Sequence, residues 1–280
     1  MKGPIVIIDA ADKLGRGIVE AALGEQWPTI AVCADTAAMN ELRERHSSAE
    51  LVTLAGSTRD ETSSAALAAA LRELDRPIAG IVIAAAGEPL RGRVLDSPAR
   101  ELLNRIDADL LPQIAAARHL LPLLAASGRN GSYVVVGSPG SEHPWAGYGA
   151  RSVAAAAVTM LTRVLHDEAR AFGVRVQQLT LSRPVRTDEN RACACDGWPS
   201  AAAIGEQVLA LIEQTDTRKS SDAVVRFTSP PRVKADEPAQ PSSHAGAISR
   251  VDTSSQHVLD QTWHALEPIF NSIRENGERK

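Results

Sequence analysis

The chain has 280 residues, with 44% hydrophobic and 23% charged side chains and a formal net charge of −4, which is ordinary for a globular protein with a full core and argues against nucleic-acid binding. No apolar run is long enough to cross a bilayer or to form a secretion signal, so we expect no membrane partner. The three cysteines, Cys33, Cys193 and Cys195, cannot build a disulfide framework and have no neighbours that complete a metal site, so we expect a cytoplasmic protein without a metal.

Apolar runs alternate with helical patterns along the first 228 residues. Short runs rich in Val, Ile and Leu are typical of buried strands, and we predict strands at residues 5–8, 29–33, 51–54, 78–85, 132–136, 174–179 and 223–227. Segments with helical apolar spacing predict helices at residues 15–23, 36–46, 64–74, 99–124, 152–172 and 201–213. Repeated strand–helix units imply right-handed crossovers. The predicted fold class is therefore α/β, a Rossmann-like doubly wound parallel β-sheet of about seven strands flanked by helices.

The composition changes after this domain, which we assign to residues 1–228. Residues 229–255 are rich in Pro, Ser and charged side chains that cannot build a core, so we predict a flexible linker. Residues 256–280 are predicted to contain an amphipathic helix, kinked at Pro268. Its apolar face would comprise Leu259, Trp263, Leu266, Phe270 and Ile273. This helix could dock on its own domain or on a partner chain, and the sequence leaves both open.

One short segment carries most of the functional information. It is Tyr148-Gly-Ala-Arg-Ser152, which follows a strand ending in Val136-Gly137-Ser138. It resembles the active-site segment of the short-chain dehydrogenase/reductase family, in which a serine precedes a tyrosine and a lysine follows the tyrosine four residues later. The resemblance implies that Tyr148 would transfer the proton and Ser138 would orient the carbonyl, but Ser152 stands where the family has its lysine.

Two further residues bear on the expected proton transfer, Asp109 and Arg151. In the family the lysine holds the nicotinamide ribose and lowers the pKa of the tyrosine, and an asparagine on the fourth helix holds a water in the proton relay. Asp109 falls at the asparagine position, where a carboxylate would oppose phenolate formation. Arg151 lies one residue before Ser152, and one residue is about 100° of rotation on a helix, so Arg151 cannot simply replace the lysine.

The expected cofactor loop is also altered. The family spaces its glycines Gly-x-x-x-Gly-x-Gly after the first strand, and here Asp9 and Lys13 replace the first two while Gly15 is retained. The Asp9 carboxylate would face a pyrophosphate, and a like-charge pair at about 5 Å with an effective dielectric of about 20 costs roughly 3 kcal/mol. Lys13 and Arg16 could offset part of this cost. We therefore expect no dinucleotide cofactor.

Other positions that contact the dinucleotide in the family are also changed in this chain. Ser57 falls where the family has an adenine contact, and Ala84-Ala85-Ala86-Gly87 replaces its Asn-Asn-Ala-Gly, so Gly87 keeps the turn without the two amides. Asp35 ends the second strand and could either accept a bond from a ribose hydroxyl or cap the next helix. The retained candidates for cofactor binding are therefore Gly15, Asp35 and Gly87.

These changes favour a non-catalytic subunit, a pseudoenzyme that assembles with itself or with an active family partner. Members of the family pair through their fourth and fifth helices, which here lie around residues 105–124 and 152–172. The matching residues are small or apolar. They are Leu110, Ile114, Ala117, Leu121, Ala154, Ala157, Val158, Leu161 and Leu165.

Two alternatives remain from the sequence, so whether the chain is an enzyme stays undecided. One is an active but atypical NAD- or NADP-dependent carbonyl or hydroxyl oxidoreductase that uses Tyr148 and Ser138 and favours NADPH through Lys13 and Arg16. The other is a ligand-binding regulatory module that uses the former substrate cleft, with Arg183 or Arg186 holding an anion.

Overall fold

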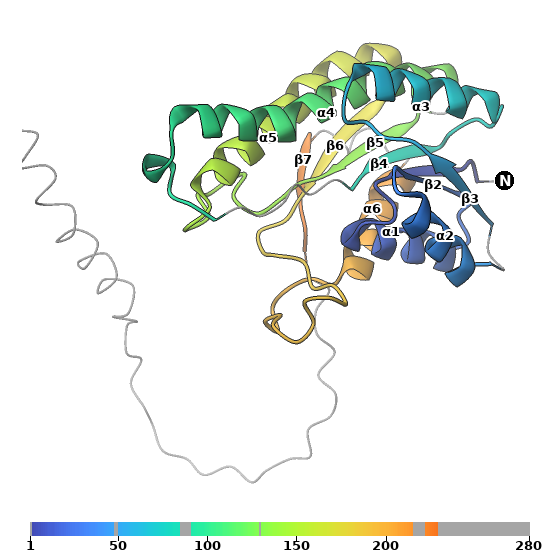
Figure 1. Ribbon diagram of the computed structural model, residues 1–280. Helices are drawn as coiled ribbons and strands as arrows, with labels where there is room; N and C mark the ends of the chain where they lie inside the picture. The colour runs from blue at the N-terminus through green and yellow to red at the C-terminus, as the bar shows by residue number, and fades with distance from the viewer. Residues whose placement is uncertain (1, 48–49, 85–90, 129, 215–221, 229–280) are drawn as a thin grey trace, which may run out of the picture. The chain divides into compact units, whose positions relative to one another are not determined.

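A computed structural model describes residues 2–47, 50–84, 91–128, 130–214 and 222–228. The predicted linker and C-terminal helix, and Gly87, lie outside the described residues. Seven strands form one parallel sheet in the order β3-β2-β1-β4-β5-β6-β7 (Figure 1). Their bounds are β1 Ile5–Ile8, β2 Thr29–Cys33, β3 Leu51–Ala55, β4 Gly80–Ile83, β5 Ser132–Val136, β6 Arg175–Thr180 and β7 Val224–Arg226. The predicted α/β fold with a doubly wound seven-stranded sheet is confirmed.

Helices cover both faces of the sheet. Helices α1, α2 and α6 lie on one face, and α3, α4 and α5 lie on the other, as Figure 1 shows. The helices are α1 Lys13–Gly24, α2 Thr36–Arg45, α3 Glu61–Glu73, α4 Ala99–Ala126, α5 Gly149–Ala169 and α6 Ala201–Glu213, with short 3₁₀ turns η1 Val94–Asp96 and η2 Arg170–Phe172. In β1, Ile5 and Ile7 face the first layer while Val6 and Ile8 face the second, and all four are fully buried.

The chain reverses the direction of strand addition beside β1. Ile5 of β1 is in register with Thr29 of β2 on one side and with Gly80 of β4 on the other. In doubly wound sheets, ligands bind outside the carboxyl ends of the strands at this reversal. The fold therefore places the ends of β1, β4 and β5 where a functional site is expected.

Two helix boundaries differ from the prediction and affect the site. Helix α1 begins at Lys13 and not at residue 15, so Lys13 belongs to its first turn. Helix α5 begins at Gly149 and not at residue 152, with Tyr148 as its N-cap residue, so Ser152 already lies inside the helix. Helix α5 also stops three residues early, because η2 follows it and Gly173 ends that turn with a φ of 69°.

Close packing joins α1 to α6. A Cβ on Gly17 would lie 2.7 Å from the backbone carbon of Ala201, and one on Gly205 would lie 3.0 Å from the backbone oxygen of Gly17. Gly17 therefore serves helix packing and not the cofactor turn. From β6, Arg175 donates to the carbonyls of Leu211 and Ile212 at the end of α6, which satisfies acceptors that the helix leaves open.

Candidate functional site

A cavity of about 320 Å³ opens at the carboxyl ends of the strands, between the sheet and helices α4 and α5. Of the two catalytic candidates, Ser138 lines it and Tyr148 does not, and Asp109, at the position of the family asparagine, lines it as well. The other lining residues are Asp9, Ala34, Ser57, Thr58, Arg59, Ala108, Pro112, Gln113, Val135, Val136, Gly137, Arg151, Ala155, Val158 and Gln178. We call it the strand-end cavity.

The turn after β1 keeps a glycine-like backbone with an aspartate in it. Asp9 has a φ of 56°, a left-handed conformation that favours glycine but that aspartate tolerates better than most residues. Gly15 remains necessary, because a Cβ there would collide with the backbone oxygen of Asp9 and lie 2.8 Å from the Cα of Ala10. The main chain of the turn thus survives, and a side chain has been added on the cavity side.

The carboxyl group of Asp9 is electrostatically unfavourable where it lies. Burial raises its pKa above the ordinary value, the nearby Asp12 raises it further, and Arg59 partly opposes both. An anionic ligand at this turn would add to the same repulsion. The environment of Asp9 therefore supports the sequence argument against a pyrophosphate here.

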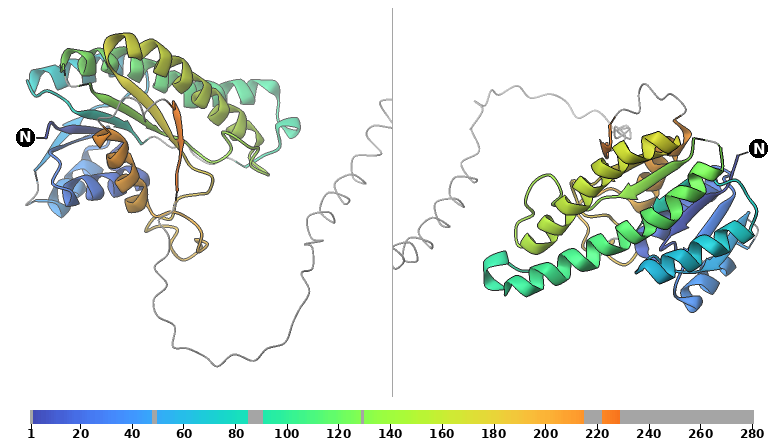
Figure 2. Two further views of the ribbon diagram at one scale, coloured as in Figure 1. Left: turned by 180° about the vertical axis from the view of Figure 1, so that it is seen from behind. Right: turned by 90° about the horizontal axis from the view of Figure 1, so that it is seen from above.

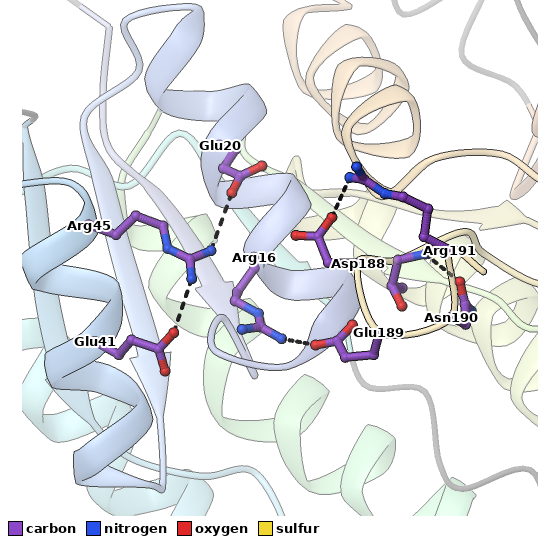
Figure 3. Close-up of polar contacts among 9 residues, drawn as sticks. Arg16, Glu20, Glu41, Arg45, Asp188, Glu189, Asn190 and Arg191 are labelled. Atoms are coloured by element: carbon purple, nitrogen blue, oxygen red, sulfur yellow. Dashed lines mark hydrogen bonds and ion pairs between the residues drawn. The ribbon is translucent and has the colours of Figure 1, made fainter.

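Lys13 and Arg16 lie outside the strand-end cavity. They line a second cavity, of about 420 Å³, between α1, the start of α6 and the segment after β6. Figure 3 shows Arg16 of α1 directed at Glu189 of that segment, with which it forms an ion pair. The same figure shows Arg45 held by Glu20 and Glu41. The two cations of the cofactor loop thus meet a carboxylate of the protein itself on the outer side of α1.

The two arginines proposed to hold an anion in the old substrate cleft do not line the strand-end cavity either. Arg186 lines the second cavity, beside Lys13 and Arg16. Arg183 donates a hydrogen bond to the carbonyl of Gly197, at 3.3 Å. The idea of an arginine-bound anion in the cleft therefore has no geometric support from these two residues.

Asp35 is the N-cap of α2. Its Oδ1 accepts hydrogen bonds from the backbone nitrogens of Ala37 at 2.8 Å and Ala38 at 3.3 Å. Of the two roles left open for Asp35, the structure shows the cap. Ser57 lines the strand-end cavity, and its hydroxyl accepts a bond from the backbone nitrogen of Arg59 at 3.1 Å.

Tyr148 is held by groups that the sequence did not indicate. Its ring stacks on Trp145 with centroids 4.0 Å apart, and its oxygen accepts a hydrogen bond from Nε of Arg91 at 2.8 Å. Backbone bonds fix this pair, because the nitrogen of Gly92 donates to Gly147 and the nitrogen of Gly149 donates to Gly92. Tyr148 is not among the residues that line the strand-end cavity, whereas Ser138 is.

Ser152, in the first turn of α5, is bonded to the loop that precedes the helix. Its hydroxyl accepts a bond from the backbone nitrogen of Trp145 at 2.9 Å and donates one to the carbonyl of Tyr148 at 3.0 Å. Gly140, with a φ of 98°, packs so close that a Cβ there would lie 2.7 Å from the Ser152 hydroxyl. The Ser152 hydroxyl is therefore held against the loop of residues 139–147.

Charged residues of α4 and α5 meet at the far end of the cavity. Asp109 forms an ion pair with Arg105, one helical turn away, at 3.1 Å. Arg151 is buried and lines the cavity, and burial together with Arg105 lowers its pKa, against the effect of Asp109. The sequence analysis treated Arg151 only as a failed substitute for lysine, but the structure makes it a cavity residue.

Two buried glutamines in the wall were missed by the sequence analysis. Gln113 of α4 is 7% exposed and Gln178 of β6 is fully buried. A Cβ on Gly137 would collide with the amide of Gln178, so the glycine makes room for it. The available sequence signal was the Gln177-Gln178 pair within a predicted buried strand.

The described residues also show whether a metal site or a membrane span is present. Among the described residues, no three His, Cys, Asp or Glu side chains converge in a way that could hold a metal ion. In the same part of the chain, no helix has the length and apolar character that a membrane span requires.

Comparisons with known proteins agree with this fold. Residues 10–229 match the family model described as Enoyl-(Acyl carrier protein) reductase. No curated protein matches the chain.

Solved structures share the architecture at low sequence identity. A short-chain dehydrogenase from Streptomyces avermitilis has 21% identity and a TM-score of 0.67, with 81% of this chain and 89% of that one covered. An NADPH-bound short chain oxidoreductase from Pseudomonas aeruginosa PAO1, described as containing an atypical catalytic center, has 19% identity and a TM-score of 0.68, with 80% and 94% covered. A short-chain type dehydrogenase/reductase from Mycobacterium ulcerans has 16% identity and a TM-score of 0.67, with 80% and 87% covered.

At these identities the solved structures establish a common fold and nothing about a substrate. The family model adds sequence evidence over most of the length, including the altered turn after Asp9 and the Tyr148 segment. The resemblance first drawn from Ser138 and Tyr148 is therefore confirmed, and the chain belongs to the short-chain dehydrogenase/reductase family.

Proposed function

We propose that this chain is a non-catalytic member of its family, a cytoplasmic pseudoenzyme whose role is assembly. The observation that carries the proposal is the position of Ser152, whose hydroxyl bonds to both Trp145 and Tyr148 and packs against Gly140. The missing lysine has thus been replaced by a structural contact.

The turn after β1, where the family binds its cofactor, also supports a non-catalytic role. The Asp9 side chain occupies the position of the first family glycine and its carboxyl group is already unfavourable. Lys13 and Arg16 line the second cavity and not the strand-end cavity. A dinucleotide bound in the family manner would place its pyrophosphate against Asp9 without a compensating cation from this loop.

An apolar surface on α4 and α5 supports assembly. The two helices run side by side on the same face of the sheet (Figure 2). Large apolar side chains along them are substantially exposed. They are Leu103, Leu111, Ile114, Val153, Met160 and Val164, together with Phe172 in η2, directly after α5. We call this set the α4–α5 face, and we propose that a second copy of the chain, or a catalytic family member, packs on it.

The exposed residues of these helices differ from those expected at the interface. Ala117 and Ala154 were expected to lie at the interface, but they are 2% and 0% exposed within a single chain. Their small side chains instead let α4 and α5 approach each other and the sheet. An apolar groove of about 470 Å³ results between the ends of the two helices, and Ile114, Leu121, Leu165 and Phe172 are among the residues that line it.

The test combines cofactor binding with turnover. Calorimetric titration of the full chain with NADH and NADPH should show no binding up to about millimolar concentration, and the protein should not turn over carbonyl substrates. Binding at micromolar concentration together with turnover would overturn the proposal.

One contact favours an active alternative. Arg91 supplies a cation to the oxygen of Tyr148 from a different segment than the family lysine, and the solved neighbour with an atypical catalytic center binds NADPH. If the chain is an active reductase, Tyr148→Phe abolishes its turnover and Arg91→Met shifts its pH profile. Unchanged turnover in Tyr148→Phe would reject this alternative.

A further inference from the structure

Cations outnumber carboxylates in the second cavity, which lies between α1, the start of α6 and the segment after β6. Five cationic side chains line it, together with three carboxylates. The cations are Lys13, Arg16, Arg45, Arg186 and Arg191. Among the described residues, none lines both this cavity and the strand-end cavity, so these charges do not belong to the former cofactor cleft.

Each carboxylate of the second cavity is already paired with an arginine (Figure 3). The pairs are Glu20–Arg45 at 3.9 Å, Asp188–Arg191 at 2.6 Å, and Glu189–Arg16. Lys13 and Arg186 are both exposed, and the described part of the chain holds no ion pair for either of them. The lining of the cavity therefore has two positive charges in excess.

Glu189 shows that these cations stabilise a negative charge. Burial raises the pKa of its carboxyl group, but hydrogen bonds together with Arg16 and Lys13 outweigh burial, so the pKa is lowered overall. The side chain of Glu189 is 39% exposed and that of Arg16 is 28% exposed, so both reach water. An ion pair in such a setting is weak, and an external anion of higher charge can therefore replace the carboxylate at Arg16.

A phosphate group is the anion that fits this set of cations best. Near pH 7 a phosphate monoester carries about two negative charges and three acceptor oxygens, so it can contact several cations at once. Guanidinium groups match the geometry of phosphate oxygens, and an ammonium adds a compact charge. Helix α6 also starts at this wall, after its N-cap Ser200, and the positive end of its dipole adds to the same potential.

The walls of the second cavity favour a compact ligand. Its volume of about 420 Å³ lies within the range of roughly 300–1,000 Å³ that ligand pockets typically span. The uncharged residues that line it are all small. They are Gly17, Thr187, Ser200, Ala201 and Ala202. These side chains offer little apolar surface to a purine or nicotinamide ring, so a nucleotide gains little beyond its phosphates.

We propose that the second cavity binds a phosphate group of a small, compact compound through Lys13, Arg16 and Arg186, and that Glu189 competes with the phosphate for Arg16. The proposal does not depend on the loss of catalysis, because the cavity is separate from the strand-end cavity. It gives the chain a ligand site on the outer side of α1.

The first test titrates the full chain with inorganic phosphate and with pyrophosphate. Calorimetry measures the affinity, and the ³¹P NMR line width reports binding independently. Acetate at equal ionic strength is the control for general charge screening. Phosphate should bind at least tenfold more tightly than acetate, and pyrophosphate should bind more tightly still, because it carries more charge.

Variants of the cations locate the binding. Lys13→Met and Arg186→Met each remove one charged contact and should weaken phosphate binding about tenfold. The matched control is Arg183→Met, because Arg183 is an exposed cation of the same segment, donates to the carbonyl of Gly197 and does not line the cavity. Thermal melts verify that the variants are folded.

A variant of Glu189 tests the competition with a change of opposite sign. Glu189→Gln frees Arg16 and should tighten phosphate binding up to about fivefold, since an exposed ion pair is worth up to about 1 kcal/mol. Glu206→Gln is the control, because it also removes one exposed carboxylate, from α6, but lines neither cavity. A gain in affinity cannot result from a loss of folded protein.

The outcomes separate this proposal from the proposed function. The phosphate site is overturned if phosphate binds no more tightly than acetate, or if Lys13→Met and Arg186→Met both bind like Arg183→Met. Titration with NADPH and NADH identifies the source of the phosphate, because only NADPH carries a phosphate on its adenosine ribose. If NADPH alone binds at micromolar concentration and displaces phosphate, the cavity takes its phosphate from a dinucleotide, which overturns both the compact ligand and the proposed loss of cofactor binding.

Discussion

At Ser152, a single hydroxyl shows how a catalytic position becomes a structural one. The side chain has both a donor and an acceptor role within the loop of residues 139–147, and Gly140 lies against it. A lysine at this position would therefore lose both hydroxyl bonds and change the contact with Gly140.

We predict that Ser152→Lys fails to create reductase activity and destabilises the protein by roughly 1–3 kcal/mol, through overpacking of a buried site. Urea denaturation measures the change in the free energy of unfolding, and cofactor oxidation measures activity. Ser152→Ala is the control, and it should lose only about 1 kcal/mol from the missing bonds. Turnover in Ser152→Lys would contradict the view that the position is structural.

Asp9 leads to a prediction about pH. Its pKa in the folded protein is raised above the ordinary 3.8, so the folded state retains a proton that the unfolded state releases. Stability from this group is therefore lost as the pH rises through the folded pKa. Asp9→Asn keeps a side chain that tolerates positive φ and removes the charge, so it should stabilise the protein at pH 7, and the gain should shrink as the pH falls toward about 4.

Thermal melts across this pH range check the prediction for Asp9. Asp107→Asn, at an exposed position on α4, serves as the control and should show no such trend. A gain for Asp9→Asn that is independent of pH would mean that the carboxyl group is not destabilised by its surroundings.

At the scale of elements, the contact between α1 and α6 depends on glycines more than on large side chains. Gly17 and Gly205 let the two helix backbones approach each other, while Ile18 and Val208 fill the space beside the sheet. This close contact positions the start of α6 and the residues after β6 next to α1.

Gly17→Ala should therefore destabilise the protein by roughly 1–3 kcal/mol, because its Cβ would meet the backbone of Ala201, which cannot rotate away. In an open helix the same change would stabilise by about 1 kcal/mol. Gly24→Ala, at the end of the same helix, has nothing within 4 Å and is the matched control. Equal unfolding midpoints for the two variants would show that the close approach is not required.

The strands were predictable because a parallel sheet is buried on both faces and its strands are continuous apolar runs, as in residues 5–8 and 132–136. The helix starts at Lys13 and Gly149 were not predictable, because Asp12 and Tyr148 cap without side-chain bonds. Arg91, 57 residues from Tyr148, was invisible because only the backbone bonds of Gly92 bring the two together. Ser138 and Asp109 line the same cavity, since strand ends and the helix beside them share one edge of the fold.

For the whole molecule, the exposed apolar residues of the α4–α5 face are the surface that the proposed assembly would cover. Helices α4 and α5 expose several large apolar side chains, which would favour aggregation of a single chain. Pairing through this face would remove these side chains from water. The proposal of self-assembly can be tested without knowledge of any ligand.

We predict that the chain is an oligomer in light scattering after size exclusion, and that Met160→Glu shifts it toward the monomer. Met160 is 55% exposed in the centre of the α4–α5 face, where a buried, unpaired carboxylate would oppose pairing. Leu95→Glu is the control, since Leu95 is 87% exposed on η1 and does not belong to the α4–α5 face. A wild-type monomer, with no change in Met160→Glu, would point to a different family member as the partner.

The stack of Trp145 on Tyr148 has an optical consequence. An indole 4.0 Å from a phenol, beside a loop fixed by Ser152 and Gly92, has an environment that changes as soon as the loop moves. Trp145 is one of four tryptophans and stacks on Tyr148, so a Trp145→Phe difference spectrum isolates its emission. The fluorescence of Trp145 thus reports whether the loop of residues 139–147 moves when a ligand or a partner chain binds.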